Sequence, residues 1–520
     1  MVKSLAAPQT IWANSQLYKG RERIYKILWH ICLLGLVGFV AKQTWDSGAD
    51  PSLIAWLFYV AGIAAILFRP RYGIYLIMFF GLVGDASLIY WYPFEKNLSS
   101  IESLLYLNDS VIFSPLESYI LITILSWLGR IGLRQKVEFF AGELFLPAIF
   151  FCFFLVIGLM YGLATGGSPV IALWESRPIF YLPVMLVLTS NLIQERTQIK
   201  RLIWICMVAI FIEGLIGSYW VAFILEFSLA NVLGLAEHSS AIHINTFFVF
   251  TMAIWIYRNS ATKRLSLLLM APPIALTYLA SQRRASFVTL AVAIVFIAII
   301  LYKENRTVFW TLAPIIGVMA VAYIGIFWNN TGALGLPAQA IKSMIAPDPN
   351  SEDAASNIYR VLENVNVNFT IHESPLFGVG FGKKFFIIVP MADISFFDWW
   401  EYIVHNSIFW YWMKTGVLGF MSMLFLICSS IMVGVRIIWR LPGGELSAVA
   451  TVCTLYILMH FLYAYVDMSW DNQSMIYVGT SMGLLNCFEH IVTKPVPIAR
   501  KRWAWQTEPE PEPTLLPLSY

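Results

Sequence analysis

The chain has 520 residues, of which 59% are hydrophobic, 16% aromatic and only 12% charged, and its mean hydropathy is +0.70. Soluble domains carry about 25% charged residues, so this composition excludes a soluble globular protein, a disordered chain and a nucleic-acid-binding protein. Apolar runs recur from residue 24 to residue 491 almost without a break. The sequence therefore predicts one polytopic membrane protein rather than several soluble domains.

Apolar stretches of about 20 residues mark candidate membrane spans. They predict an all-α polytopic membrane protein with about 12–14 transmembrane helices and one long extracytoplasmic loop carrying short helices. The stretch 404–437 is too long for one straight span and holds Gly416 and Gly419, so we expect a break there. The candidate spans are residues 24–41, 52–68, 72–92, 111–128, 139–163, 177–194, 200–224, 240–257, 265–281, 285–302, 308–327, 404–437, 446–466 and 473–491.

These spans divide the chain into five predicted regions. The C-terminal one holds the run Glu508-Pro-Glu510-Pro-Glu512-Pro, which cannot pack into a core. The N-terminal one is polar and basic and has no cleavable signal. The regions are a cytoplasmic segment (1–23), transmembrane helices 1–11 (24–327), the extracytoplasmic loop (328–402), transmembrane helices 12–14 (403–491) and a disordered cytoplasmic tail (492–520).

Lys and Arg indicate the orientation, because loops on the cytoplasmic side carry more of them. With both termini cytoplasmic, 24 of the 34 basic residues fall on the inner side. The ten exceptions are Lys42, Lys96, Arg177, Arg283, Arg284, Lys342, Arg360, Lys383, Lys384 and Lys414. An arginine near the hydrocarbon costs about 2.5–3.5 kcal/mol on insertion scales. Arg177, Arg283 and Arg284 therefore predict an outer anion site, although each of them alone could also reach the outer headgroups by snorkelling.

The cysteines predict no disulfide and no metal site. A disulfide framework would place cysteines in the loops on the oxidising side. All six instead lie inside apolar segments, and their spacing resembles no metal-binding motif: Cys32, Cys152, Cys206, Cys428, Cys453 and Cys487.

The predicted outer loop contains a helix that lies along the surface. Ile358, Leu362, Val365 and Phe369 follow one another at helical spacing and form one apolar stripe. On the same helix, the polar residues Arg360, Glu363 and Asn364 are expected to face elsewhere.

A glycine run, Gly378-Val-Gly380-Phe-Gly382, follows this helix. It lacks the strand–loop–helix context of a phosphate-binding loop. We interpret it as a tight turn that docks the loop onto the helix bundle, with direct substrate contact as the less favoured alternative.

His405 is the candidate base. Of the seven histidines, it is the one expected at the outer membrane surface and at the N-terminal end of a helix. A helix N-terminus disfavours the imidazolium form, which would keep the ring neutral and able to accept a proton. The alternative is a helix-start histidine that bonds only to the loop backbone.

Several motifs, in this order, resemble those of the O-antigen ligase and polymerase superfamily. Asn357-Ile-Tyr-Arg360 precedes Glu373-Ser-Pro375-Leu-Phe-Gly378-Val-Gly380-Phe-Gly382, which resembles the family signature hPlfGvGxG. His405-Asn406-Ser407 followed by Gly416-Val-Leu-Gly419 resembles its His-Asn…Gly-x-x-Gly element. Upstream, Ser281-Gln-Arg283-Arg284-Ala285-Ser286 and Ser176-Arg177-Pro178-Ile-Phe-Tyr181 resemble its arginine motifs. The resemblance covers residues 170–440.

This resemblance implies a membrane glycosyltransferase of the bacterial inner membrane. A glycan would leave undecaprenyl diphosphate and join an acceptor hydroxyl on the outer face with inversion, without a cofactor, a nucleotide sugar or a metal. The implied partners are this lipid-linked glycan, an acceptor that is a glycan, lipid or protein, and membrane lipid, but no nucleic acid. The implied site has His405 as the catalytic base, Arg177, Arg283, Arg284 and Arg360 on the donor pyrophosphate, and Asn406, Gly378, Gly380, Gly416 and Gly419 as supporting residues.

The residue types suit this chemistry. Arginine forks match phosphate oxygens bidentately, and a positioned histidine base typically contributes about 10²–10⁴-fold to a rate. Ligase and polymerase share the motifs, so one sequence does not separate them.

Two other classes of protein are also to be considered for this sequence. A multi-pass transporter, for example of inorganic carbon or a small anion, would use carboxylates inside the membrane, and the predicted spans hold Asp85, Glu117, Glu143 and Glu213. Against transport, no paired spans broken by Gly or Pro occur in corresponding halves of the sequence. A membrane scaffold or sensor explains neither the outer arginines nor the long loop.

Overall fold

The computed structural model describes residues 51–132, 139–228, 234–394 and 399–493, apart from positions 86, 90, 331, 347, 350 and 351, together with four isolated positions before residue 51. The predicted first span, except for those isolated positions, therefore lies outside the described residues, and so does the tail beyond residue 493. The chain divides into two compact units, one of residues 1–80 with 89–138 and a second of residues 81–88 with 139–520.

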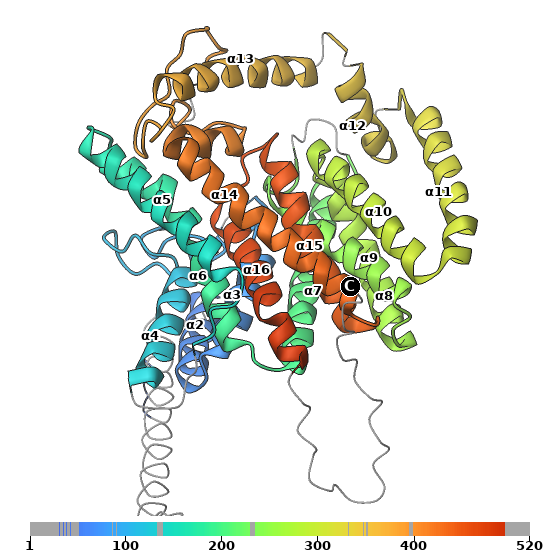
Figure 1. Cartoon of the computed structure of the whole chain (residues 1–520), viewed down its shortest axis with the longest axis horizontal. Coiled ribbons are helices and arrows are strands. Elements are labelled where there is room, and N and C mark those ends of the chain that lie inside the picture. Colours follow the sequence, from blue (N-terminus) through green and yellow to red (C-terminus); the bar gives the residue numbers. More distant parts are fainter. Residues whose placement is uncertain are drawn as a thin grey trace, which may run out of the picture. The chain divides into compact units, whose positions relative to one another are not determined.

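The fold is that of an all-α polytopic membrane protein, as predicted. Within the described residues every regular element is a helix (Figure 1). Seven of these described helices are long and apolar enough to cross a membrane: α5 (Phe145–Ala164), α6 (Pro169–Leu192), α7 (Arg196–Tyr219) with its extension η1 (Trp220–Ile224), α10 (Arg284–Glu304), α11 (Arg306–Phe327), α14 (Ser407–Arg440) and α15 (Glu445–Ala464).

Shorter or less apolar helices complete the described part of the chain. Three are apolar but short: α2 (Pro51–Phe68), α3 (Arg71–Val83) and α8 (Ser240–Ile256). The others are α4 (Pro115–Gly132), α9 (Ala261–Ala280), η2 (Ala333–Gly335), α12 (Leu336–Ile345), α13 (Glu352–Glu373) and α16 (Asn472–Thr493). The total number of membrane spans stays a prediction.

In the first unit, α2 packs against α4. The Tyr119 hydroxyl donates to the Tyr59 carbonyl oxygen at 3.0 Å, and the two rings stack with 5.5 Å between centroids. Gly62 allows this contact, since a Cβ there would lie 2.1 Å from the Tyr119 hydroxyl oxygen. A small residue thus sets the close approach of these helices.

In the second unit, α16 is buried by α6, α14 and α15. Gly479 and Gly483, four residues apart, lie against the backbone of α6. A Cβ at Gly479 would lie 2.3 Å from the Leu182 carbonyl oxygen, and one at Gly483 would lie 2.7 Å from that of Leu186. This spacing of small residues permits close helix packing where no water is present to drive association.

The helix α3 is shorter than its predicted span, residues 72–92, because the chain turns after Val83. The buried Asp85 carboxylate accepts hydrogen bonds from the backbone N–H groups of Ser87 and Leu88 at 2.8 and 3.1 Å. A side chain that bonds the backbone two and three residues further on favours a turn over a helix. Asp85 also accepts from the Glu237 N–H at 2.9 Å, which ties this turn to the segment before α8.

The expected break in α14 is confirmed at Gly416. This residue has φ 68° and ψ −173°, a conformation that favours glycine. A Cβ at Gly416 would lie 2.1 Å from the Leu376 carbonyl oxygen, so the break receives the chain that follows α13. One turn on, Gly419 leaves room for Thr415, whose Oγ1 would lie 2.2 Å from an added Cβ.

The helix α13 lies across one end of the second unit and contacts α14 (Figure 1). The helix forms where the sequence predicts it, and Glu363 lies on a different face from the apolar stripe, as expected. Ile358 is 59% exposed and Val365 is 42% exposed, so the apolar stripe faces away from the bundle. The buried face carries Glu363 and Asn366 instead, because these side chains find partners there; Asn366 Oδ1, for example, accepts from the Ile388 N–H at 2.9 Å.

Candidate active site

His405 and Glu363 form a pair at the end of the second unit that carries α13. The Nδ1 of His405 lies 3.2 and 3.1 Å from the two carboxylate oxygens of Glu363, and its backbone N–H donates to Oε2 at 2.9 Å. The Glu363 side chain is 2% exposed, whereas that of His405 is 35% exposed. With the Nδ1 proton directed at the carboxylate, the neutral ring has its lone pair on Nε2, which can accept a proton.

Asn406 fixes the start of α14 one residue after His405. Its side-chain oxygen accepts from the Phe409 N–H at 3.0 Å, which is an N-cap. The next residue, Ser407, donates from its hydroxyl to the Asp467 carbonyl oxygen at 3.2 Å. The histidine therefore stands at a helix start, as predicted, and the loop between α15 and α16 is bound to that start.

A second histidine–carboxylate pair involves the same loop. The Nδ1 of His238 lies 2.9 Å from Asp467 Oδ2, and the Tyr463 hydroxyl lies 3.1 Å from the same oxygen. Burial raises the pKa of Asp467, but the hydrogen bond from His238 and the positive charges of His238, Arg360 and protonated His405 outweigh burial and lower this pKa to about 2. Asp467 is therefore negatively charged at neutral pH, close to the cations of the site.

Two of the four predicted arginines lie close enough to this cluster for their charges to act on it. The charges of Arg283 and Arg360 both act on the Tyr463 hydroxyl, and Arg360 acts on Asp467 as well. Arg283 stands directly before α10 and donates from Nη2 to the Ala236 carbonyl oxygen at 3.1 Å. The Nε atoms of Arg283 and Arg360 are buried and have no hydrogen-bond partner among the residues that the structure describes. Such guanidinium groups are suited to an anion.

The other two predicted arginines lie on α6 and at the start of α10. Arg177 on α6 donates from Nε to the Tyr181 hydroxyl at 3.2 Å, and its guanidinium lies 5.1 Å from the centre of the Trp174 ring. Arg284 is the first residue of α10, next to Arg283. The predicted meeting of Arg177 with the Arg283–Arg284 turn stays a prediction.

The glycine run packs between α5 and α14. The N–H of Gly380 donates to the Lys414 carbonyl oxygen at 3.1 Å, and a Cβ at Gly380 would lie 2.3 Å from the Cα of Gly162. A Cβ at Gly378 would lie 2.3 Å from the Met413 carbonyl oxygen. Both glycines have positive φ, 68° at Gly378 and 85° at Gly380. These contacts are those of a turn that docks the loop onto the bundle.

Lys414, one of the basic residues predicted on the outer side, is fully buried in an ion pair. Its Nζ lies 2.7 Å from Glu175 Oε1, and both side chains are 0% exposed. Lys414 also donates to the Lys383 carbonyl oxygen at 2.5 Å, and Glu175 Oε2 accepts from the Gly382 N–H at 2.5 Å. The pair therefore connects α6, α14 and the glycine run, two residues before Arg177.

Sequence reasoning missed four residues of the site: Glu363, Asp467, His238 and Tyr463. Glu363 lies three residues after Arg360, and this spacing, which places both on neighbouring parts of one helix surface, was the available signal. His238 and Asp467 pair across 229 positions, a contact that a single sequence does not show.

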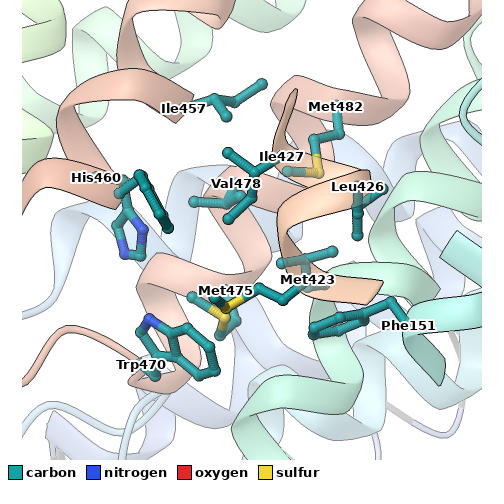
Figure 2. Close-up of a pocket in the computed structure, with 12 residues that line it drawn as sticks. Phe151, Met423, Leu426, Ile427, Ile457, His460, Trp470, Met475, Val478 and Met482 are labelled. Atoms are coloured by element: carbon teal, nitrogen blue, oxygen red, sulfur yellow. The ribbon is translucent and has the colours of Figure 1, made fainter. Parts of the chain in front are cut away.

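The cavities of the second unit differ in what they can hold. An apolar void of about 20 Å³ has His460 in its wall and is on the scale of one water molecule. Figure 2 shows the side chains that line this void. His460 is buried and its Nε2 lies 3.0 Å from the Ser469 carbonyl oxygen, so this histidine is a packed residue. A larger apolar cavity of about 580 Å³ is lined by α9, α10, α11 and α12, and it includes Tyr278 and Phe287, on either side of the Arg283–Arg284 turn.

The described part of the chain has the fold of a polytopic membrane protein, and its candidate site groups a histidine, carboxylates and arginines. Residues 265–424 match the model of a family described as O-Antigen ligase. This segment runs from α9 into α14 and holds Arg283, Arg284, Arg360 and His405, while Arg177 lies outside it. The resemblance drawn from the motifs is therefore confirmed over this segment. A comparison with curated proteins finds no match.

Proposed function

We propose that the chain is a membrane glycosyltransferase of the O-antigen ligase and polymerase type. It transfers a glycan from undecaprenyl diphosphate to an acceptor hydroxyl on the outer face of the inner membrane, without a metal. The observation that supports this most strongly is the pairing of His405 with the buried Glu363, close to Arg360 and within the segment that matches the family.

In the proposed reaction the acceptor oxygen attacks the anomeric carbon on the face opposite the diphosphate, which inverts that carbon. The Nε2 of His405 takes the acceptor proton as the new C–O bond forms, and the Glu363 carboxylate stabilises the imidazolium that results. The electron pair of the breaking C–O bond passes to the diphosphate oxygen. Its developing negative charge is stabilised by the guanidinium groups of Arg283 and Arg360.

Asp467 balances the charge of this site before the donor binds. Arg283 and Arg360 are like charges in a partly buried region, where their repulsion is stronger than in water. The negative charge of Asp467, held by His238, offsets that repulsion. We infer that Asp467 is a positioning residue rather than a second base, because it is 5% exposed.

The apolar cavity beside the Arg283–Arg284 turn suits the isoprenoid chain of the donor. Three of its walls, α9, α10 and α11, come from helices predicted to lie in the membrane. Within the part of the chain that the structure describes, α11 has no buried residue. A chain lying between α10 and α11 would end next to the arginines that bind the diphosphate. This arrangement separates the apolar and anionic parts of one lipid, as a lipid-linked donor requires.

A transporter has less support, because three of the carboxylates that suggested one have fixed structural partners. Asp85 accepts from three backbone N–H groups. Glu117 accepts from the Ser114 N–H at 2.6 Å at the start of α4, and Glu143 forms an ion pair with Arg436 at 2.5 Å. Carboxylates that carry an ion or a proton across a membrane must exchange partners during the cycle.

Deletion of the gene in the host bacterium tests the proposed function. The mutant should lose a surface glycan and accumulate the corresponding lipid-linked glycan in its inner membrane, because the donor is made but not consumed. Mass spectrometry of extracted lipids measures this pool, with the complemented strain as control. A mutant with an unchanged pool of lipid-linked glycans and a full complement of surface glycans would contradict the proposal.

The proposed orientation places α13 outside the cytoplasm. Asn368, which is exposed on α13, is replaced by cysteine in a chain whose native cysteines are replaced by serine. A membrane-impermeant maleimide should label it in intact spheroplasts, because the loop 328–402 faces the outside. The matched control is Ser260→Cys, an exposed position between α8 and α9 on the predicted inner side, which should be labelled only after lysis. The reverse pattern would mean that the orientation is inverted.

A further inference from the structure

A cavity next to the His405 pair has no role in the proposed mechanism. Its volume is about 220 Å³. Four tryptophans line it: Trp174, Trp399, Trp410 and Trp470. Among the other residues that line it are four with polar side chains: Glu175, Ser407, Asp471 and Asn472.

The cavity lies between two of the predicted site residues. Trp174 lines it, and the guanidinium of Arg177 lies 5.1 Å from the centre of the Trp174 ring. Val404 and Ser407 also line it, and they stand on either side of His405 in the chain. A ligand in this cavity would therefore contact both the α6 arginine region and the start of α14.

Tryptophan walls with polar groups at their edge match one class of ligand, a sugar ring. An indole has a flat apolar face and a polar edge. A pyranose ring is divided in the same way, since its C–H groups form the faces and its hydroxyls point outward at the rim. The ring can stack on an indole while its hydroxyls bond to neighbouring polar side chains.

The tryptophans are placed for such stacking. The rings of Trp174 and Trp399 lie 5.7 Å apart between centroids at an interplanar angle of 56°, so their faces are not closed against each other. Trp399 stands in the segment before α14 and is half-buried, so part of its surface is open. Trp410 and Trp470 meet edge to face at 6.0 Å and form a second wall.

The polar groups favour a sugar over a hydrocarbon chain. Asn472 Oδ1 is buried and has no hydrogen-bond partner among the described residues. An unpartnered buried acceptor costs free energy that a ligand hydroxyl can recover, whereas an isoprenoid chain cannot. The volume corresponds to about seven water molecules at ~30 Å³ each, room for one sugar ring rather than for a glycan chain.

We propose that this tryptophan cavity binds the sugar residue next to the diphosphate of the lipid-linked donor. The proposal rests on the proposed function, because it requires the lipid diphosphate donor. It adds Arg177, the predicted outer arginine beside the cavity, to the ligands of that diphosphate. It assigns to Trp174 and Trp399 the stacking faces and to Asn472 an acceptor for a sugar hydroxyl. The sugar would then lie between the leaving diphosphate and His405.

The variant Trp399→Ala tests this proposal in the full chain reconstituted in nanodiscs. Two probes are compared, the lipid-linked glycan extracted from the membranes of the host bacterium and undecaprenyl diphosphate without sugar. The variant should bind the lipid-linked glycan about tenfold more weakly, the scale of one lost aromatic contact. Its affinity for undecaprenyl diphosphate without sugar should be that of the unchanged protein. Trp399→Phe should restore most of the affinity, because it keeps a flat aromatic face.

Trp400→Ala is the matched control, since Trp400 is the next residue in the chain and lies outside the cavity lining. It should bind both probes like the unchanged protein. Equal affinity of Trp399→Ala and the unchanged protein for the lipid-linked glycan would overturn the proposal. So would an equal loss for both probes, because that pattern would reveal a lipid or diphosphate contact instead of a sugar contact.

The same titrations separate this proposal from the proposed function. Arg177→Ala should weaken the binding of both probes, because both carry the diphosphate. If Arg177→Ala does so and Trp399→Ala binds the lipid-linked glycan normally, the sugar site alone is wrong. If the unchanged protein binds neither probe, the proposed donor and the sugar site are both wrong.

Discussion

The variant His405→Ala should lower glycan transfer by about 10²–10⁴-fold, the contribution of a positioned histidine base. Its affinity for the lipid-linked donor should stay close to that of the unchanged protein, because the arginines that bind the diphosphate are retained. The physical reason is the pairing of Nδ1 with Glu363, which leaves Nε2 free to take the acceptor proton. Donor titration and single-turnover transfer, measured on the same preparation, separate binding from turnover.

His372→Ala is the matched control for this prediction. His372 is exposed near the end of α13, and its Nδ1 bonds to the carbonyl oxygen of Asn368 within the same helix. The His372→Ala variant should transfer glycan at the rate of the unchanged protein. If His405→Ala lost donor affinity together with turnover, the histidine would be a structural residue that holds α14 to α13. Full transfer by well-folded His405→Ala would refute the role of His405 as the catalytic base.

The variant Arg283→Lys should lower transfer by about 10²-fold, on the scale of removing one donor that stabilises a developing anion. Arg283 uses Nη2 to hold the Ala236 carbonyl oxygen, and its Nε has no hydrogen-bond partner among the described residues. A lysine can place one charge in this region but cannot bind two phosphate oxygens with a planar fork. Donor affinity should fall as well, because the diphosphate is charged before the reaction begins.

Arg264→Lys is the control for Arg283→Lys. Arg264 lies in the first turn of α9, at the end predicted to face the cytoplasm. Its guanidinium is 5.2 Å from the ring centre of Trp255. This change should leave transfer unaltered. An Arg283→Lys protein with unchanged transfer and donor affinity would remove Arg283 from the proposed anion site. A loss of heat stability in Arg283→Lys but not in Arg264→Lys would point to a packing role instead.

The sequence predicts most of the helices because hydrophobic runs and their breaks are local signals. The break at Gly416 follows from a span that is too long and from a residue that tolerates positive φ. The end of α3 was misplaced because a buried carboxylate, Asp85, forms its turn with partners that include a residue about 150 positions away. Such a turn is decided by tertiary contacts rather than by composition.

The candidate site was predictable only in part. His405 was recognised from its helix-start position and its motif, both of which are local. Glu363 was correctly separated from the apolar stripe of Ile358 and Val365, but the sequence does not indicate that Glu363 lies on the buried face and the stripe on the exposed one. In this helix the hydrogen bonds of buried polar residues outweigh the burial of the stripe. The pair of His238 and Asp467 lies outside the reach of one sequence, since neither residue belongs to a motif.

Release of undecaprenyl diphosphate by the purified protein tests the central claim most directly. The full chain is reconstituted in nanodiscs with lipid-linked glycan from the host bacterium and an acceptor extract from the same cells, and the released lipid diphosphate is measured by mass spectrometry. The proposed function predicts release that depends on the acceptor and that falls at least 10²-fold in His405→Ala, about the smallest loss expected for a base. No release above that of empty nanodiscs, or equal release by His405→Ala, would contradict it.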